Sequence, residues 1–513
     1  MKGRGCADGR KQRTYINKDN ASAQTVATEA LFITCVLDAL ERRDVATVGI
    51  PGAFMQVDMG EETVHMKIEG KMARILERID PIKYTKSVVI ENGKPVIYKL
   101  LKALYGTMQA ALMFWKNLSG TLTGWGFKIN PYDWCVANKT INGHQMTIVW
   151  HVDDLKMSHK DPSVVTGYIN KLRGKYGKEA PLTMKRGKLH KYLGMTLDYC
   201  TDGKVKVDMT KYVREILNEC NNITGVAVTP AADYLFNVDE LSKELAKKEA
   251  DLFHHITAKL LFLSKRGRPD IQTSVAFLTT QVKKPTIEDI RKLHRCIQYL
   301  RGSSKLVLTL ESSRSGTVWW WVDAAFAVHH NMRSHTGGAM TFGKGAIISQ
   351  STKQKLNTKS STEAELVAVD DMMPTILWVR HFLMAQGRDI KDNIIYQDNQ
   401  STMRLTNNGK RSSGKRTRHI NIRYFFVTDR ISRKEVKVEY CPTNLMIADF
   451  YSKPLQGKTF RLFRSLLLNL NNPLLHTRVT FNDQNAVTET NSSVTAQECV
   501  VENTEYYESE KRV

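Results

Sequence analysis

The stretch Gln145–Ser158, which reads QMTIVWHVDDLKMS, constrains the fold more than any other part of the chain. An apolar run rich in β-branched residues leads to Asp153 and Asp154, and a second short alternating run follows them. This order is typical of a β-hairpin with two carboxylates at its turn. Adjacent carboxylates repel each other unless a cation lies beside them, and Mg²⁺ takes carboxylate and phosphate oxygens as ligands. The pair is a candidate metal site, although a solvated Asp-Asp turn is the commoner meaning of this dipeptide alone.

The charge of the chain is unusual, whereas its hydrophobic content is ordinary. The 513 residues suffice for two to four domains, and 42% of them are hydrophobic. Lys and Arg number 75 against 52 Asp and Glu, which gives a net charge of +23. Such an excess favours an anionic partner, most often nucleic acid, because contacts with phosphates release counterions. A membrane surface is the alternative, but we find no clear basic amphipathic helix, apolar span or lipidation signal.

The cysteines and the first residues bear on the cellular compartment. None of the eight cysteines forms a CxxC pair or has the spacing of zinc ligands, which favours reduced thiols. The segment MKGRGCADGRKQR at the start has no apolar core of the kind that a signal peptide needs. We therefore expect an intracellular protein that is not secreted and does not bind a membrane.

Four further acids stand where predicted strands end or helices begin. Asp323 ends the run VWWWVDAAF, Glu365 lies in the helix start SSTEAELVAV, Asp398 follows the run IIYQ, and Asp449 lies in IADFYSKPL. In an α/β fold such ends converge at one edge of the sheet, where sites form. We therefore expect these four carboxylates to lie together as a second candidate metal site.

Each of these acids also has a simpler explanation. Thr362 and Glu365 have the spacing of a capping box, so Glu365 could cap its helix, and Glu363 could be the ligand instead. Asp398 alone could be a turn residue, and Asp449 alone a helix-start residue. The ordered set of four favours the functional interpretation.

Five segments follow one another in an order that points to a known family. They read AFMQVDMGEETVHM (53–66), KALYGTMQAALMFW (102–115), the hairpin with His151 in the place of a Tyr, KYLGM (191–195) and RPDI (268–271). Together they resemble the reverse transcriptase of copia-type LTR retrotransposon Pol polyproteins. The resemblance implies that Gly106 lets the backbone approach a nucleotide and that Gln109 lies beside the incoming nucleotide. Ala111-Leu112 replaces the Pro-Arg of the family.

The second set of acids resembles the ribonuclease H domain of the same elements. RSHTG (333–337) and RTRHINI (416–422) match further segments of that domain. The resemblance implies that Asp323, Glu365, Asp398 and Asp449 bind two Mg²⁺ or Mn²⁺ ions and hydrolyse the RNA strand of an RNA–DNA hybrid. Phosphate contacts are expected from the basic run that contains Lys415, Arg416, Arg418 and His419. For His419, catalysis and phosphate contact both remain open.

One catalytic position of the polymerase is replaced. The family motif DVKTAF carries the first metal-binding Asp five positions before its Phe, and the counterpart of that Asp here is Gly49, five positions before Phe54. Asp44 mimics the motif but lies five residues further back, which on a strand means roughly 16 Å and the opposite face. Glycine offers no side-chain oxygen, so Asp153 and Asp154 would lack a partner ligand. We expect the polymerase to be impaired.

The resemblance implies an α+β multidomain protein, with a right-hand polymerase of fingers, palm and thumb followed by a ribonuclease H-like α/β domain. We expect N-terminally truncated fingers and palm at 1–225, a mainly helical thumb or connection at 226–312, the ribonuclease H-like domain at 313–456, and a C-terminal helix with a disordered tail at 457–513. The polar segment 311–317 is a candidate linker.

The expected function is that of an RNA-directed DNA polymerase and hybrid-specific ribonuclease with a doubtful polymerase site. The expected partners are an RNA template, an RNA–DNA hybrid and deoxynucleoside triphosphates, with the capsid, protease and integrase of the retroelement outside this chain. The resemblance implies a location in a cytoplasmic particle, the nucleus or both. The alternative is a decayed or non-catalytic remnant that only binds nucleic acid.

Overall fold

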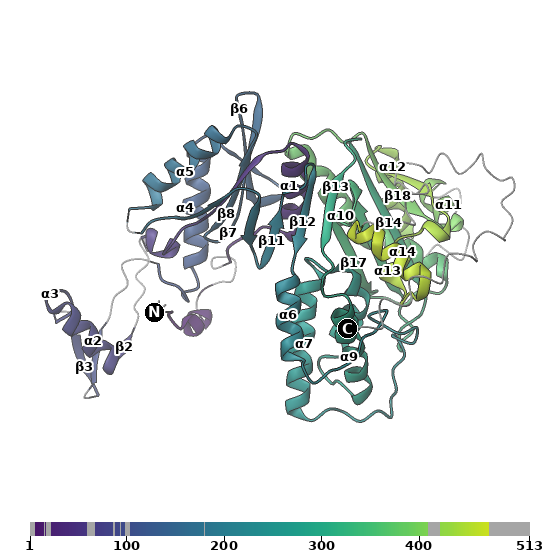
Figure 1. Cartoon of the computed structure of the whole chain (residues 1–513), viewed down its shortest axis with the longest axis horizontal. Helices are drawn as coiled ribbons and strands as arrows, with labels where there is room; N and C mark the ends of the chain where they lie inside the picture. The colour runs from purple at the N-terminus through teal and green to yellow at the C-terminus, as the bar shows by residue number, and fades with distance from the viewer. Residues whose placement is uncertain are drawn as a thin grey trace, which may run out of the picture. The chain divides into compact units, whose positions relative to one another are not determined.

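The computed structural model describes residues 6–14, 16, 22–58, 67–85, 88–92, 94–97, 103–178, 180–408 and 421–470. These residues belong to one unit, Met1–Leu470, and many of its helices and strands are labelled in Figure 1. The predicted α+β class is confirmed. The predicted disordered tail falls within Asn471–Val513, which lies outside the described residues. Within the described residues, no helix is both long and apolar enough to cross a membrane.

A six-stranded sheet carries the predicted aspartate hairpin. Its strands are, in order, β5 (Lys128–Asn130), β6 (Asp133–Ile141), β7 (His144–His151), β8 (Asp154–His159), β1 (Asp44–Gly49) and β9 (Thr183–Arg186). Helix α5 (Pro162–Tyr176) packs on β1 and β8, and α4 (Ala110–Gly124) contacts β5. The residues of β7 from Met146 to Trp150 are all buried, as expected for a strand with both faces covered.

A small sheet with two short helices forms a separate layer early in the chain. Its elements are β2 (Ile68–Glu69), α2 (Lys71–Ile79), α3 (Pro81–Tyr84), β3 (Val88–Glu91) and β4 (Lys94–Ile97), with strand order β2-β4-β3. This layer lies in the segment 1–225 that we assigned to the fingers and palm.

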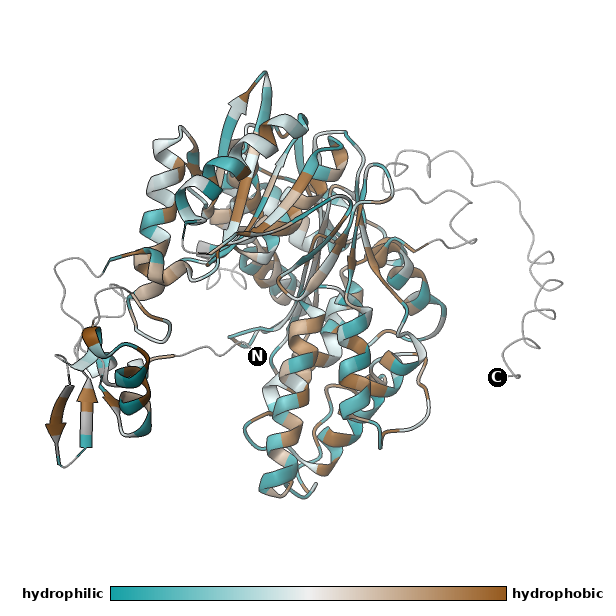
Figure 2. Cartoon of the chain, turned by 60° about the vertical axis from the view of Figure 1, so that its left-hand side comes forward, coloured by the Kyte–Doolittle hydropathy of each residue, from teal (hydrophilic) through white to brown (hydrophobic). Residues whose placement is uncertain are grey.

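The segment assigned to the thumb or connection is mainly helical, as the sequence predicts. It contains α7 (Lys247–Ser264), α8 (Gln272–Gln281) and α9 (Ile287–Gly302), and α6 (Thr210–Glu219) precedes it and contacts α7 and α9. Figure 2 shows hydrophobic and hydrophilic residues alternating along these helices. Helix α7 buries Phe253, Ile256 and Leu260, whereas Leu261 is 39% exposed.

A five-stranded sheet joins the first three of the four predicted parts of the chain. Its strand order is β10 (Leu189–Tyr192), β11 (Met195–Asp198), β12 (Lys204–Asp208), β13 (Leu308–Ser312) and β16 (Gly343–Lys344). Glu311 and Ser312 belong to β13 and pair with Lys344 and Gly343. The prediction of a linker over 311–317 was therefore wrong for these two residues and for Thr317, which begins β14, because strand pairing from distant parts of the chain outweighs their polar, turn-prone character.

The sheet of the predicted ribonuclease H-like part has the order β17 (Ile348–Lys353), β15 (His335–Thr341), β14 (Thr317–Ala325), β18 (Asp392–Gln397) and β19 (Lys437–Tyr440). Strands β14, β18 and β19 are parallel. Helix α10 (Ser361–Ala385) packs on β14 and β15. Among the described residues this part also contains α11 (Gln400–Asn408), α12 (Asn421–Ser432) and α13 (Asp449–Ser452), and α14 (Gly457–Leu468) follows it. Trp320 on β14 is fully buried and donates to the Asn393 side chain at 2.9 Å.

Candidate active sites

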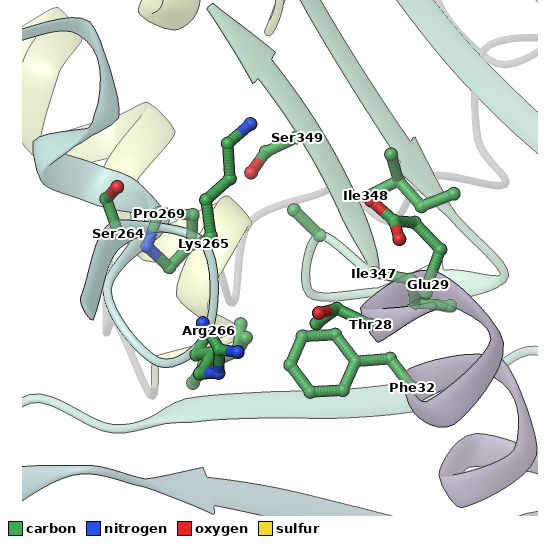
Figure 3. Close-up of a pocket in the computed structure, with 12 residues that line it drawn as sticks. Thr28, Glu29, Phe32, Ser264, Lys265, Arg266, Pro269, Ile347, Ile348 and Ser349 are labelled. Carbon is green, nitrogen blue, oxygen red and sulfur yellow. The ribbon is translucent and has the colours of Figure 1, made fainter. Parts of the chain in front are cut away.

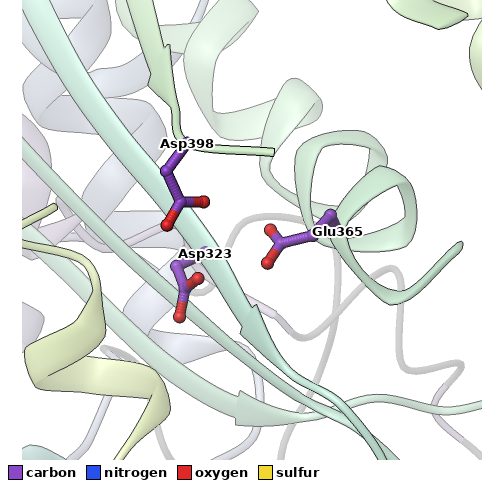
Figure 4. A group of neighbouring side chains, drawn as sticks. All are labelled: Asp323, Glu365 and Asp398. Atoms are coloured by element: carbon purple, nitrogen blue, oxygen red, sulfur yellow. The ribbon is translucent and has the colours of Figure 1, made fainter. Parts of the chain in front are cut away.

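Three of the four predicted ribonuclease carboxylates converge at one edge of the parallel strands. Asp323 lies on β14, Asp398 directly follows β18, and Glu365 lies near the start of α10. Figure 4 shows the three side chains pointing toward one another, and each offers an oxygen within 4.8 Å of the others. The edge is shared because parallel strands end on the same side. Three such oxygens fit a hard divalent cation.

The fourth acid, Asp449, lies on the other side of Asp323, with a lysine between the two. Lys453 Nζ is 3.2 Å from Asp323 Oδ2 and 2.6 Å from Asp449 Oδ1. Ser452 Oγ also donates to Asp323 Oδ2. Sequence reasoning missed both Ser452 and Lys453, although Lys453 follows Asp449 at the spacing that brings side chains together on a helix. Asp323 thus faces two carboxylates on one side and an ammonium group on the other.

Burial and crowding perturb the acids of this cluster. Burial raises the pKa of Glu365 well above its usual value, and the charges of Asp323 and Asp398 add to the shift. Burial and Asp323 also raise the pKa of Asp398, and they raise the pKa of Asp449 to about 7 although Lys453 opposes them. Burial lowers the pKa of Lys453, but Asp323 and Asp449 outweigh it, so the net shift is upward. The surroundings therefore do not fully stabilise the negative charge of the cluster, and a bound cation would stabilise it.

The structure decides between the two glutamates near the start of α10. Ser360 caps the helix and accepts from the Glu363 N–H at 3.3 Å, while Glu363 Oε2 accepts from the Lys359 N–H at 2.8 Å. The capping pair is thus Ser360 and Glu363, so the alternative in which Thr362 and Glu365 form the box is wrong. Glu365 Oε2 instead accepts from Gln397 Nε2 at 3.2 Å and faces the cluster. The phosphate contacts expected from Lys415, Arg416, Arg418 and His419 fall outside the described residues.

Of the two predicted polymerase aspartates, Asp153 lies in the hairpin turn and Asp154 begins β8. Strands β7 and β8 pair from Thr147 and Ser158 to His151 and Asp154, which leaves Val152 and Asp153 in the turn. Val152 adopts a left-handed conformation with φ of +58°. Burial raises the pKa of Asp154, and the charge of Asp153 adds to the shift. The two carboxylates therefore lie close enough to repel each other.

Gly49 lies opposite Asp154 on the neighbouring strand. The register of β1 and β8 pairs Gly49 with Asp154 and Asp44 with His159, so Asp44 lies at the far end of β1. Asp44 also forms an ion pair with Arg186 there. A Cβ added at Gly49 would lie 3.3 Å from Asp154 Oδ1 and 2.5 Å from Thr183 Oγ1. A side chain at position 49 would therefore point at the aspartate, but the Thr183 hydroxyl fills that space.

The two residues expected beside a nucleotide lie near the first described segment. Gly106 has φ of +93°, and a Cβ there would lie 2.0 Å from the carbonyl oxygen of Ala7. The Ala7 N–H donates to the Tyr105 carbonyl at 2.7 Å. Gln109 is buried and directly precedes α4. Glycine is therefore needed at 106 for contact with the Ala7 backbone, and its role toward a nucleotide stays a prediction.

One further pocket, shown in Figure 3, contains none of the predicted site residues. It lies between Phe32 of α1 (Thr28–Leu40), Lys265 at the end of α7, and Ile348 of β17. Its volume is about 20 Å³, which has room for a single water molecule. It is too small for a substrate.

The chain is similar to a reverse transcriptase family and to polyproteins of retrotransposons. Residues 1–231 match the family described as reverse transcriptase (RNA-dependent DNA polymerase). The Pol polyprotein from transposon TNT 1-94 of Nicotiana tabacum is 25% identical over 467 residues, covering 90% of this chain and 33% of the relative. The Pol polyprotein from transposon RE1 of Arabidopsis thaliana is 27% identical over 382 residues, covering 73% of this chain and 25% of the relative. The predicted resemblance to copia-type Pol polyproteins is confirmed.

The matches differ in how much of each relative they cover. This chain spans about a third or less of those two polyproteins. A putative transposon Ty5-1 protein of Saccharomyces cerevisiae is 24% identical over 299 residues, covering 58% of this chain and 94% of the relative. The crystal structure of prototype foamy virus protease-reverse transcriptase covers 88% of this chain and 49% of its own at 14% identity, with a TM-score of 0.22. That score is too low to support a conclusion about the fold.

Proposed function

We propose that this retrotransposon segment cleaves the RNA strand of an RNA–DNA hybrid and that its polymerase site is impaired. The observation that carries the first half is the convergence of Asp323, Glu365 and Asp398 within 4.8 Å. The observation that carries the second half is Gly49 opposite Asp154. We expect the partners to be an RNA template, its hybrid with DNA and deoxynucleoside triphosphates.

The side chains around the ribonuclease cluster suit a metal-assisted hydrolysis. Divalent Mg²⁺ or Mn²⁺ bound to such carboxylates activates a water and stabilises a leaving 3′ oxygen. Asp323, Glu365 and Asp398 would hold it. Gln397 donates to Glu365, and Thr443 donates to Asp398 Oδ2 at 3.0 Å, so two of the three carboxylates are held in place by neighbours. Such partners orient metal ligands and raise metal affinity.

The polymerase site lacks one of the oxygens that the chemistry needs. Asp153 and Asp154 remain at their turn, but position 49 offers no side-chain ligand and Thr183 occupies the space. A site with fewer carboxylates holds its cations less tightly. We therefore expect the protein to bind primed template and to extend the primer very slowly or not at all.

The test is hybrid cleavage by the purified chain. RNA labelled at one end and annealed to DNA should be cut in Mg²⁺ or Mn²⁺, and Asp398→Asn should abolish cutting. The matched control is Asp392→Asn, because Asp392 lies on the same strand but pairs with Lys437 instead of facing the cluster. Cleavage that survives Asp398→Asn, or that continues in EDTA, would contradict the assignment.

The alternative, a non-catalytic nucleic-acid-binding remnant, is favoured by the loss at Gly49 alone. The same experiment separates the two functions. Hybrid binding without any cleavage, in protein that is folded, would support the remnant, whereas cleavage that depends on Asp398 would exclude it.

A further inference from the structure

Asp323 serves two different groups of partners. Toward β18 and α10 it faces the carboxylates of Asp398 and Glu365. Toward α13 it faces Asp449, and here the Lys453 ammonium group lies within 3.2 Å of both acids. A cation that bridged Asp323 and Asp449 would need the oxygens that Lys453 contacts. The Lys453 ammonium group therefore already places a positive charge on the Asp323–Asp449 edge of the cluster.

Local backbone geometry holds the lysine in this position. The Lys453 N–H donates to the Asp449 carbonyl at 2.9 Å, which fixes residue 453 one helical turn after Asp449. The adjacent Ser452 donates its hydroxyl to the same Asp323 Oδ2 that Lys453 approaches. That oxygen thus has two donors, and the Lys453 side chain is only 38% exposed. The contact is built from consecutive residues of one turn.

Charge argues against a lysine and a second metal ion on this edge together. In a two-metal site the ions share a carboxylate and lie about 3.5–4 Å apart. A second divalent ion on the Asp323–Asp449 edge would lie beside the ammonium group and repel it. The ammonium group already supplies one of the positive charges that balance the four carboxylates, and it does so on this edge.

We propose that Lys453 takes the place of the second cation, so that the ribonuclease site binds one divalent ion instead of two. This inference rests on the proposed ribonuclease function and corrects our expectation of two ions at that site. The single ion would lie among Asp323, Glu365 and Asp398. Lys453 is then a positioning residue, which neutralises Asp449 and the Asp323 oxygen that it contacts, while Asp323 still faces the ion.

The test counts Mn²⁺ ions per chain by calorimetry and by electron paramagnetic resonance. All proteins carry Asp153→Asn and Asp154→Asn, which removes the polymerase aspartates from the count. The protein with Lys453 intact should bind one Mn²⁺, Lys453→Met should bind two, and Lys453→Arg should bind one because the charge remains. The matched control is Lys437→Met, which breaks a lysine–aspartate pair away from the cluster and should still bind one.

The outcomes separate this inference from the proposed function. Two ions in the protein with Lys453 intact would overturn the inference and leave the ribonuclease function standing. One ion in folded Lys453→Met would also overturn it. No bound ion in any variant would contradict the proposed function as well. If Lys453→Met does not fold, the spectrum of the intact protein decides, because two ions about 4 Å apart would couple magnetically and a single ion would not.

Discussion

Restoring the carboxylate at position 49 should restore DNA synthesis, and Thr183 determines by how much. A Cβ at residue 49 would lie 2.5 Å from Thr183 Oγ1, which is too close, whereas Thr183 Cβ lies at 3.9 Å. Gly49→Asp alone must therefore displace the threonine hydroxyl. Thr183→Ala removes that oxygen and leaves the ordinary contact. We expect extension to increase in the order wild type, Gly49→Asp, then Gly49→Asp with Thr183→Ala.

The size of the effect follows from the contacts of the metal site. Loss of a group that merely orients a metal ligand costs about 10–100-fold in affinity or activity. Loss of a ligand itself should cost more, so the double variant should extend primers at least about 100-fold faster than wild type. Since a factor of ten corresponds to about 1.4 kcal/mol, this is roughly 3 kcal/mol of barrier. Thr183→Ala alone should give no gain.

Primer extension on an RNA template measures these rates. Asp44→Asn serves as the control, because Asp44 lies at the far end of β1 in an ion pair with Arg186 and should not affect extension beyond its effect on stability. Robust synthesis by the wild type that disappears with Asp44→Asn would refute the reasoning, and so would a folded double variant with no gain.

Two further predictions concern binding and acid stability. Binding of RNA–DNA hybrids should be independent of sequence and weaken steeply with salt, with a slope of log K against log salt of about −4 or steeper; a flat slope would contradict extensive phosphate contact. Burial lowers the pKa of His329 to about 4. Burial also lowers the pKa of His335 to about 3, and His329 and Lys353 add to that shift. The unfolded chain therefore takes up protons first, and the unfolding free energy should fall as pH drops from about 6.5 to 4, by about 3 kcal/mol for His329. Urea unfolding should show a shallower pH dependence when both are changed to Gln, and an unchanged one would refute this.

Strand-end acids could be placed from the sequence because apolar runs are long and well bounded. The run before Asp323 and the run before Asp398 become adjacent parallel strands, which brings both carboxylates to one edge. The aspartate hairpin was equally clear, since only residues 152 and 153 separate its paired strands. In these cases the hydrophobic periodicity of the sequence and the tendency of sites to form at strand ends point to the same residues.

The remaining features depend on contacts that local sequence patterns do not predict. Thr183 reaches Gly49 only because β9 pairs with β1 across more than 130 residues. Glu311 and Ser312 read as a polar turn but pair with β16. In the run Lys359-Ser360-Ser361-Thr362, three hydroxyl residues could each be the N-cap of α10. Because Ser360 is the N-cap, the glutamate that takes part in the capping contacts is Glu363. Local propensity could not choose among these arrangements.

We propose that the ribonuclease site is complete and that the polymerase site is not. The most direct measurement uses one hybrid, a DNA primer annealed to an RNA template, with different labels on the two strands. In Mg²⁺ the purified chain should shorten the RNA while the primer keeps its length, and Asp398→Asn should leave both strands intact. A primer that lengthens while the RNA remains whole would contradict the account.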